Sequence, residues 1–136
     1  MALTKRRPGL VYPVYEDWIY AGSGGSAPAF TQTTGVDNWS NVGSPWPAMA
    51  FRLRETGIVD LAGTLERTGA GGTIFTLPAK YRPTEQAHFP VVHQVASVKS
   101  ALLLTVSTTG QVRVGDAASG DIVYINGSIF LNTAAP

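Results

Sequence analysis

The chain has 136 residues, no cysteine, a formal net charge of +1 and only 14% charged residues. This length fits one domain, and the lack of cysteine excludes a disulfide framework, a thiolate zinc site and a thiol nucleophile. The near-neutral charge argues against a nucleic-acid binder, and no apolar run approaches the ~20 residues of a membrane-spanning helix. Average chains are about 25% charged. The low charge therefore predicts a surface that is largely covered by partners.

Residues 1–22 combine a basic cluster with aromatic residues and prolines. Pro8 and Pro13 prevent a regular helix and favour an extended arm. We expect this arm to anchor the chain on a partner and to be removable without unfolding the rest; the alternative is a frayed basic terminus. The residues expected to make the anchoring contact are Lys5, Arg6, Arg7, Tyr12, Tyr15, Trp18 and Tyr20.

Residues 23–47 are rich in Gly, Ser, Thr, Asn and Pro, but they also contain Phe30, Trp39 and Trp46. Aromatic residues are uncommon in disordered segments, so we expect an ordered loop region. From residue 48 to residue 136, apolar and polar residues alternate with the period of a β-strand. The predicted strands cover residues 48–54, 58–66, 73–77, 88–98, 100–107, 111–114 and 122–131.

The fold class follows from the spacing of these strands and from the lack of an amphipathic helical pattern. Short strands separated by turn residues, such as Thr56-Gly57, predict an all-β fold, either an antiparallel β-sandwich or a barrel-like body. Leu102, Leu103 and Leu104 interrupt the alternation. A strand that is apolar on both faces is either central under a covering loop or part of a subunit interface. Gly127 predicts a bulge in the last strand.

The sequence offers no convincing catalytic, metal or cofactor site. His88 and His93 are five positions apart, so a regular strand places them on opposite faces, as two separate surface or interface histidines. Asp116 and Asp121 flank a predicted solvated turn and lack the ladder of a calcium loop. No phosphate-binding loop, nucleophile elbow or closely spaced carboxylate pair is present. We therefore expect no enzyme activity.

The segment from Pro78 to Pro83 predicts a pinned loop, because two prolines fix its direction. Tyr81 and Arg82 lie between them. We favour a structural role in which Tyr81 covers the edge of the body, over a role of the pair in an interface or a ligand contact.

Four segments of the body resemble a known family. The most specific is F-T-L-P-A-K-Y-R-P at residues 75–83, although Lys80 stands where the family usually has glycine. It follows G-I-V-D-L-A-G at residues 57–63 and precedes G-Q-V-R-V at 110–114 and V-Y-I-N-G-S-I-F at 123–130. The chain thus resembles, over residues 46–131, the C-terminal β-rich head of tail-fibre, tail-tip and receptor-binding proteins of tailed bacteriophages.

This resemblance implies a homotrimer of β-sandwich heads that binds other virion proteins and the host surface, with no enzyme activity and no cofactor. Leu102, Leu103 and Leu104 are then expected at the subunit interface. The expected location is the virion, at the tail tip or, as the alternative, on the capsid as a decoration protein that the arm anchors. A small carbohydrate-binding β-sandwich is a third hypothesis. The residues nominated for contact with a receptor glycan are Trp39, Trp46, Tyr81, Arg82 and His88.

Overall fold

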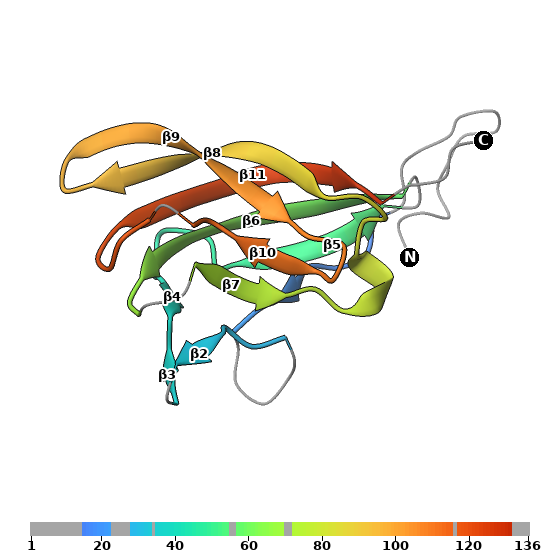
Figure 1. Cartoon of the computed structure of the whole chain (residues 1–136), viewed down its shortest axis with the longest axis horizontal. Coiled ribbons are helices and arrows are strands. Elements are labelled where there is room, and N and C mark those ends of the chain that lie inside the picture. The colour runs from blue at the N-terminus through green and yellow to red at the C-terminus, as the bar shows by residue number, and fades with distance from the viewer. Residues whose placement is uncertain are drawn as a thin grey trace.

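The structure, a computed structural model, describes residues 15–22, 28–33, 35–54, 57–69, 72–115 and 117–131. Nine strands form one curled antiparallel sheet (Figure 1). They are β1 (Ile19–Tyr20), β4 (Trp39–Asn41), β5 (Ala50–Arg54), β6 (Ile58–Arg67), β7 (Thr73–Thr76), β8 (Ala87–Val95), β9 (Val98–Val106), β10 (Gln111–Arg113) and β11 (Ile122–Phe130). A separate hairpin contains β2 (Gln32–Thr33) and β3 (Val36–Asp37), and the described residues include no α-helix. The predicted all-β class is confirmed.

The strand order in the sheet is β1-β5-β6-β11-β8-β9-β10-β7, and β4 pairs with β6 beyond the end of β5. The sheet curls so that its two ends face each other across the core. The rings of Phe51 on β5 and Phe75 on β7 stack with their centroids 5.6 Å apart. A sheet that curls in this way buries one face and leaves the other in solvent, which explains the alternation along its strands.

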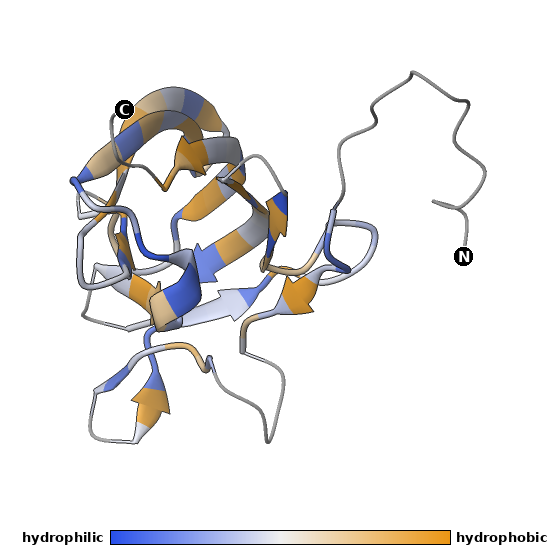
Figure 2. Cartoon of the chain, turned by 90° about the vertical axis from the view of Figure 1, so that its right-hand side faces the viewer, coloured by the Kyte–Doolittle hydropathy of each residue, from blue (hydrophilic) through white to orange (hydrophobic). Residues whose placement is uncertain are grey.

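The burial pattern follows the alternation that the sequence shows. On β6, Val59, Leu61 and Leu65 are fully buried, and on β11 Val123 and Ile125 point to the same core. The hydropathy of the strands changes along each ribbon in the same way (Figure 2). These inward residues supply most of the stability of the sheet, because each fully buried side chain of this size contributes about 1.5–3 kcal/mol.

The predicted bulge at Gly127 is wrong. β11 pairs with β6 along all of Ile122–Phe130 without a register shift. Gly127 lies instead under the ring of Phe89 on β8, and a Cβ atom there would come within 2.4 Å of that ring. β8 and β11 remain packed together at this point, although their backbone pairing includes only Ile122–Tyr124 of β11. A glycine is therefore needed for close packing, not for an irregular backbone.

Residues 28–33 and 35–47, the described part of the predicted loop region, belong to the same body. Trp39 on β4 is fully buried, and Phe30 is 6% exposed in the same core. The hydroxyl of Thr31 donates a hydrogen bond to the carbonyl of Thr73, and the amide of Thr31 donates one to Ile74 at 2.9 Å. This segment thus also covers the free edge of β7, which would otherwise expose unpaired backbone groups.

The described part of the predicted arm also lies on the body, whereas residues 1–14 lie outside the described residues. β1 pairs with β5, and Glu16 exchanges backbone and side-chain hydrogen bonds with Leu53. The Glu16 carboxylate also accepts hydrogen bonds from the Tyr81 hydroxyl at 2.8 Å and from Lys80 at 2.7 Å. Residues 15–22 are thus an integral edge of the sheet, because their backbone groups and the Glu16 carboxylate find partners there.

Candidate functional site

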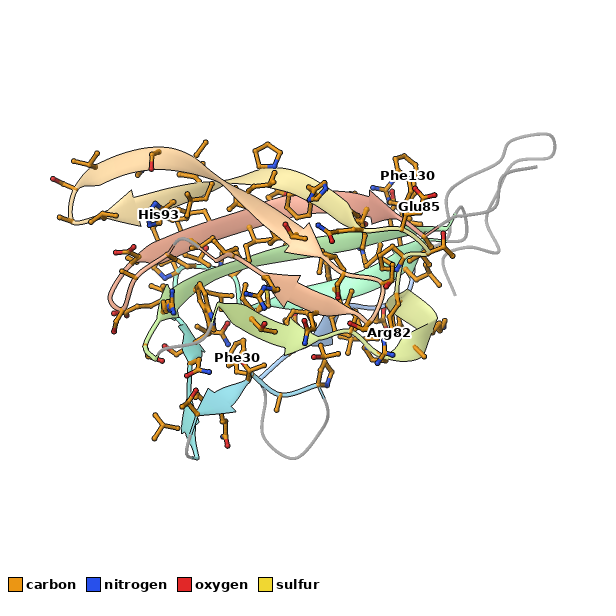
Figure 3. The ribbon with its side chains drawn as sticks, viewed as in Figure 1. Phe30, Arg82, Glu85, His93 and Phe130 are labelled. Carbon is orange, nitrogen blue, oxygen red and sulfur yellow. The ribbon has the colours of Figure 1, made fainter. Side chains whose placement is uncertain are left out.

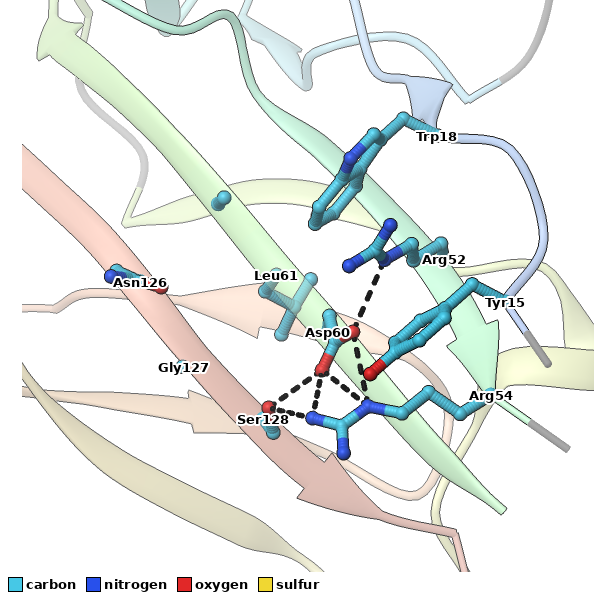
Figure 4. Close-up of a pocket in the computed structure, with 10 residues that line it drawn as sticks. Tyr15, Trp18, Arg52, Arg54, Asp60, Leu61, Asn126, Gly127 and Ser128 are labelled. Atoms are coloured by element: carbon cyan, nitrogen blue, oxygen red, sulfur yellow. Dashed lines mark hydrogen bonds and ion pairs between the residues drawn. The ribbon is translucent and has the colours of Figure 1, made fainter. Parts of the chain in front are cut away.

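A polar groove lies on the outer face of the sheet, across β5, β6 and β11. The antiparallel register sets Arg52 opposite Asp60, and Asp60 opposite Ser128. Residues that are paired across neighbouring strands point to the same face, so these three side chains form one row. Arg54 joins them from the next outward position of β5 (Figure 4).

Asp60 is the centre of the row and is 8% exposed. Its carboxylate accepts hydrogen bonds from Arg54 Nη2 at 2.6 Å, from the Ser128 hydroxyl at 2.7 Å and from Arg52 Nε at 3.2 Å. Burial acts to raise the pKa of Asp60, but the hydrogen bonds from Arg54, Ser128 and Arg52 outweigh it and hold this pKa below its usual value. Asp60 is therefore ionised at neutral pH and fixes both guanidinium groups.

Two aromatic rings from the N-terminal segment hold Arg52 in place. Its guanidinium carbon lies 4.2 Å from the ring centroid of Tyr15 and 4.2 Å from that of Trp18. Figure 4 shows the end of Arg52 between the two rings. Cations within about 6 Å of a ring face are attracted to it, by about 0.5–2 kcal/mol. The segment that was predicted to anchor the chain on a partner thus forms one wall of the groove.

The opposite wall is formed by β11, and the hollow lies between the two walls. Ala62 on β6 has only a methyl group, and it is paired with Asn126 of β11. The groove has a volume of about 270 Å³. Small-molecule sites usually measure about 300–1,000 Å³, so this groove suits one small ring or one unit of a longer ligand. Planar hydrogen-bonding groups beside aromatic rings suit recognition of a small polar ligand.

Two of the residues nominated for receptor contact are buried. Trp39 has no exposed surface, so its ring is not accessible to a receptor and belongs to the core. Tyr81 is 6% exposed, and its ring packs edge-on against Phe51 at 4.9 Å. The structural role favoured for Tyr81 thus agrees with its position. Arg82 is half-buried near the 3₁₀ turn Ala79–Tyr81, where its Nε donates to the Leu77 carbonyl at 2.8 Å (Figure 3).

The other two nominated residues are exposed but do not converge. His88 lies on the outer face of β8, where its Nδ1 is 3.4 Å from the hydroxyl of Thr105. Trp46 is 47% exposed and contacts Tyr124 of β11 edge-on at 5.6 Å. Tyr124 is two positions from Asn126 on the same face of β11. Trp46 therefore lies close to the groove, beside the residue of β11 that is two positions before Asn126.

The three leucines of β9 have different surroundings. Leu104 is fully buried in the core of the chain, and Leu102 packs partly against it. Leu103 is 55% exposed on the outer face, opposite Pro90 of β8. Only Leu103 of the three presents most of its side chain to a second molecule.

His88 and His93 lie on opposite faces of β8, as expected, but the prediction of two surface histidines is wrong for His93. His93 is 7% exposed, and its Nε2 lies 2.7 Å from the carboxylate of Asp121, also 7% exposed. The predicted solvated turn at Asp121 is wrong for the same reason. Asp121 also accepts a hydrogen bond from the Ala118 amide at 2.8 Å. The pair joins β8 to the start of β11; Asp116 lies outside the described residues.

We expect acid to weaken this contact. Hydrogen bonds from the Ala118 amide and from His93 lower the pKa of Asp121, so its carboxylate stabilises the fold above about pH 4 and loses this effect as the pH falls further. Asp121→Asn should lower the free energy of unfolding by about 1–2 kcal/mol at pH 7. Urea unfolding between pH 7 and pH 2 should show that the difference between wild type and variant shrinks below pH 4. A constant difference would contradict the assignment.

No protein-family model and no curated protein matches the sequence. Among the described residues, no group of three or more histidine, aspartate or glutamate side chains could hold a metal ion. Within the same residues, no helix is long and apolar enough to cross a membrane.

This groove was not predicted from the sequence. The alternation along residues 48–54 and 58–66 places Arg52 and Arg54 on one face of a strand and Asp60 on the polar face of the next. Together with the turn at Thr56-Gly57, this pattern is the signal that could have indicated the Arg–Asp cluster. No comparable signal places Ser128, 68 residues away from Asp60, beside it.

Proposed function

We propose that this chain is a non-enzymatic binding module of a bacteriophage tail, and that the groove between Trp18 and Asn126 binds a saccharide of the host surface. The observation that carries the proposal is the groove itself, where two aromatic rings stand beside oriented hydrogen-bonding groups. Saccharides are bound by such a combination, since the parts of aromatic rings that Arg52 leaves uncovered can contact C–H groups and planar polar side chains contact hydroxyls. The resemblance to phage receptor-binding heads and the all-β fold support the virion context.

The surroundings of the groove suit a ligand longer than one unit. Trp46 and Tyr124 form an aromatic pair on the same face, two positions from Asn126 along β11. Two residues of strand advance about 7 Å, the order of one sugar ring. A neighbouring sugar unit can therefore rest on Trp46 while the first occupies the groove.

A glycan array with the purified chain, followed by titration of the hits, tests this function. Trp18→Ala removes one wall of the groove and should weaken binding at least tenfold, about 1.4 kcal/mol. Tyr20→Ala is the matched control, because Tyr20 is an exposed aromatic residue of the same segment that does not line the groove. Circular dichroism of both variants checks that they fold. Absence of saccharide binding at millimolar concentration, or equal binding by Trp18→Ala, would overturn the proposal.

The location in the particle needs its own experiment. Antibody against this chain should label the tail of particles that contain it. Label over the capsid would instead support the alternative role, that of a capsid decoration protein.

We further propose that the chain forms a homotrimer through the outer face of the β8–β9 hairpin. Pro90, Val92 and Leu103 lie together there, and Val95 and Val98 are exposed at its tip. An exposed apolar strip of this kind is typical of an interface.

Leu103→Asp should weaken self-association at least tenfold, because a carboxylate is costly to bury at an interface. Analytical sedimentation at micromolar concentration measures this change. Thr109→Asp adds the same charge at an exposed position after β9 and should have no effect. A wild-type chain that sediments as a monomer would contradict the trimer.

A further inference from the structure

The groove carries more positive than negative charge. Two guanidinium groups, those of Arg52 and Arg54, line it together with one carboxylate, that of Asp60, which gives a formal charge of +1. Both carboxylate oxygens already accept hydrogen bonds: Oδ1 from Arg54 and Ser128, and Oδ2 from Arg52 and Arg54. The acceptor capacity of Asp60 is thus largely satisfied within the protein.

The donors of the groove, by contrast, are only partly used. Arg52 donates to Asp60 through Nε, and its two Nη groups make no hydrogen bond to any described residue. Arg54 uses Nε and Nη2 but not Nη1. The Asn126 side chain is exposed and has no hydrogen-bond partner among the described residues. Arg52 and Asn126 together thus offer about six N–H groups to a ligand, four on the two Nη atoms and two on the side-chain amide.

The position of Arg52 prepares these donors for a planar anion. Because Tyr15 and Trp18 stack on its two sides, the guanidinium cannot rotate freely, and ligand contact is left to the edge that carries the Nη groups. A fixed guanidinium edge donates two parallel hydrogen bonds to a carboxylate or phosphate, which are stronger than bonds to neutral groups.

We infer that the saccharide bound in this groove is acidic and places a carboxylate or phosphate group on Arg52, with Asn126 as a second donor. This inference rests on the proposed function and specifies the class of its ligand. The two sources of the anionic group, a uronic acid and a sugar phosphate, share the same chemistry and are separated by experiment.

Two pairs of probes differ only in the anionic group. Digalacturonic acid is compared with its neutral methyl ester, and glucose 1-phosphate is compared with glucose, by calorimetric titration of the whole chain. At least one acidic probe should bind tenfold or more tightly than its neutral partner, and its affinity should fall as the salt concentration rises, because salt screens charge in an open groove. The acidic probe that binds identifies the source.

Asn126→Asp tests the charge without removing any hydrogen bond between described residues. It lowers the formal charge of the groove from +1 to 0 at an exposed position and keeps the shape of the side chain. Binding of the acidic probe should weaken about tenfold, while the neutral partner is affected less. Arg113→Gln is the control: it removes a positive charge on β10, outside the groove, and should change neither affinity.

The outcomes separate the two proposals. Equal affinity for acidic and neutral probes, or no effect of Asn126→Asp on the acidic probe, overturns the inference and leaves saccharide binding in place. Binding to neutral glycans alone on the array likewise overturns the inference and leaves saccharide binding in place. Absence of binding to every glycan on the array and to all four probes overturns the proposed function itself.

Discussion

Replacing Gly63 with alanine is expected to lower the free energy of unfolding by roughly 3 kcal/mol or more. Gly63 lies on β6 between the residues that pair with β5 and those that pair with β4. The backbone of Met49 passes directly over it. A Cβ atom at Gly63 would lie 2.5 Å from the Met49 Cα and 2.9 Å from its backbone nitrogen. A backbone neighbour cannot rotate away, so either β6 or the segment before β5 must shift.

Thermal unfolding measures this effect, and a fall in Tm on the order of 10 °C is expected for a chain of this size. Gly115→Ala is the matched control, because no atom lies within 4 Å of the Cβ position there. That control should change stability by less than about 0.5 kcal/mol. Equal stability of the two variants would contradict the packing at Gly63.

Deleting residues 1–20 is expected to destabilise the whole body, by roughly 3 kcal/mol or more. The deletion removes β1 from the edge of the sheet and leaves β5 with unpaired backbone groups. It removes Glu16, which accepts hydrogen bonds from Leu53, Lys80 and Tyr81, and each lost hydrogen bond costs about 1 kcal/mol. It also uncovers Arg52, since Trp18 is lost. This is the opposite of the removable arm that the sequence pattern predicts.

A shorter deletion, of residues 1–14, is the control because it leaves residues 15–22 in place. Urea unfolding gives the free energy of unfolding of each variant. The difference between the two values is the contribution of residues 15–20. If the two variants are equally stable, the docking of this segment contributes nothing to the fold. Burial of Tyr81 and its hydrogen bond to Glu16 raise the pKa of the Tyr81 hydroxyl, so the longer deletion should also let this tyrosine titrate at lower pH.

The strands of the body could be predicted because their period depends on burial alone. Val59, Leu61 and Leu65 alternate with polar residues, and the curled sheet buries that face. The prediction failed where a polar or proline-rich segment covers the body, since neither hydropathy nor propensity shows what it will pack against. Trp39 and the residues around Glu16 are examples. Gly127 was misinterpreted because a glycine required by a neighbouring ring has the same appearance in sequence as one required by a bulge.

The candidate site was harder to predict than the fold, because its parts come from distant strands. Tyr15, Arg52 and Ser128 meet only through the order β5-β6-β11, and strand order is not contained in the local pattern. The same holds for His93 and Asp121, which are 28 residues apart and form a buried pair. Composition predicted a surface covered by partners, whereas the location of the groove required the register of the sheet.

The most direct test of this account is protein-observed NMR during titration with digalacturonic acid and, separately, with glucose 1-phosphate. We predict saturable shifts at the indole N–H of Trp18, the side-chain amide of Asn126 and the backbone amide of Ser128, with at least one of the two acids. Absence of shifts with both acids up to about 10 mM, roughly tenfold above a millimolar dissociation constant, would contradict an acidic-saccharide site in this groove. Shifts confined to Val92 and Leu103 would contradict it equally and would place the contact on the β8–β9 hairpin.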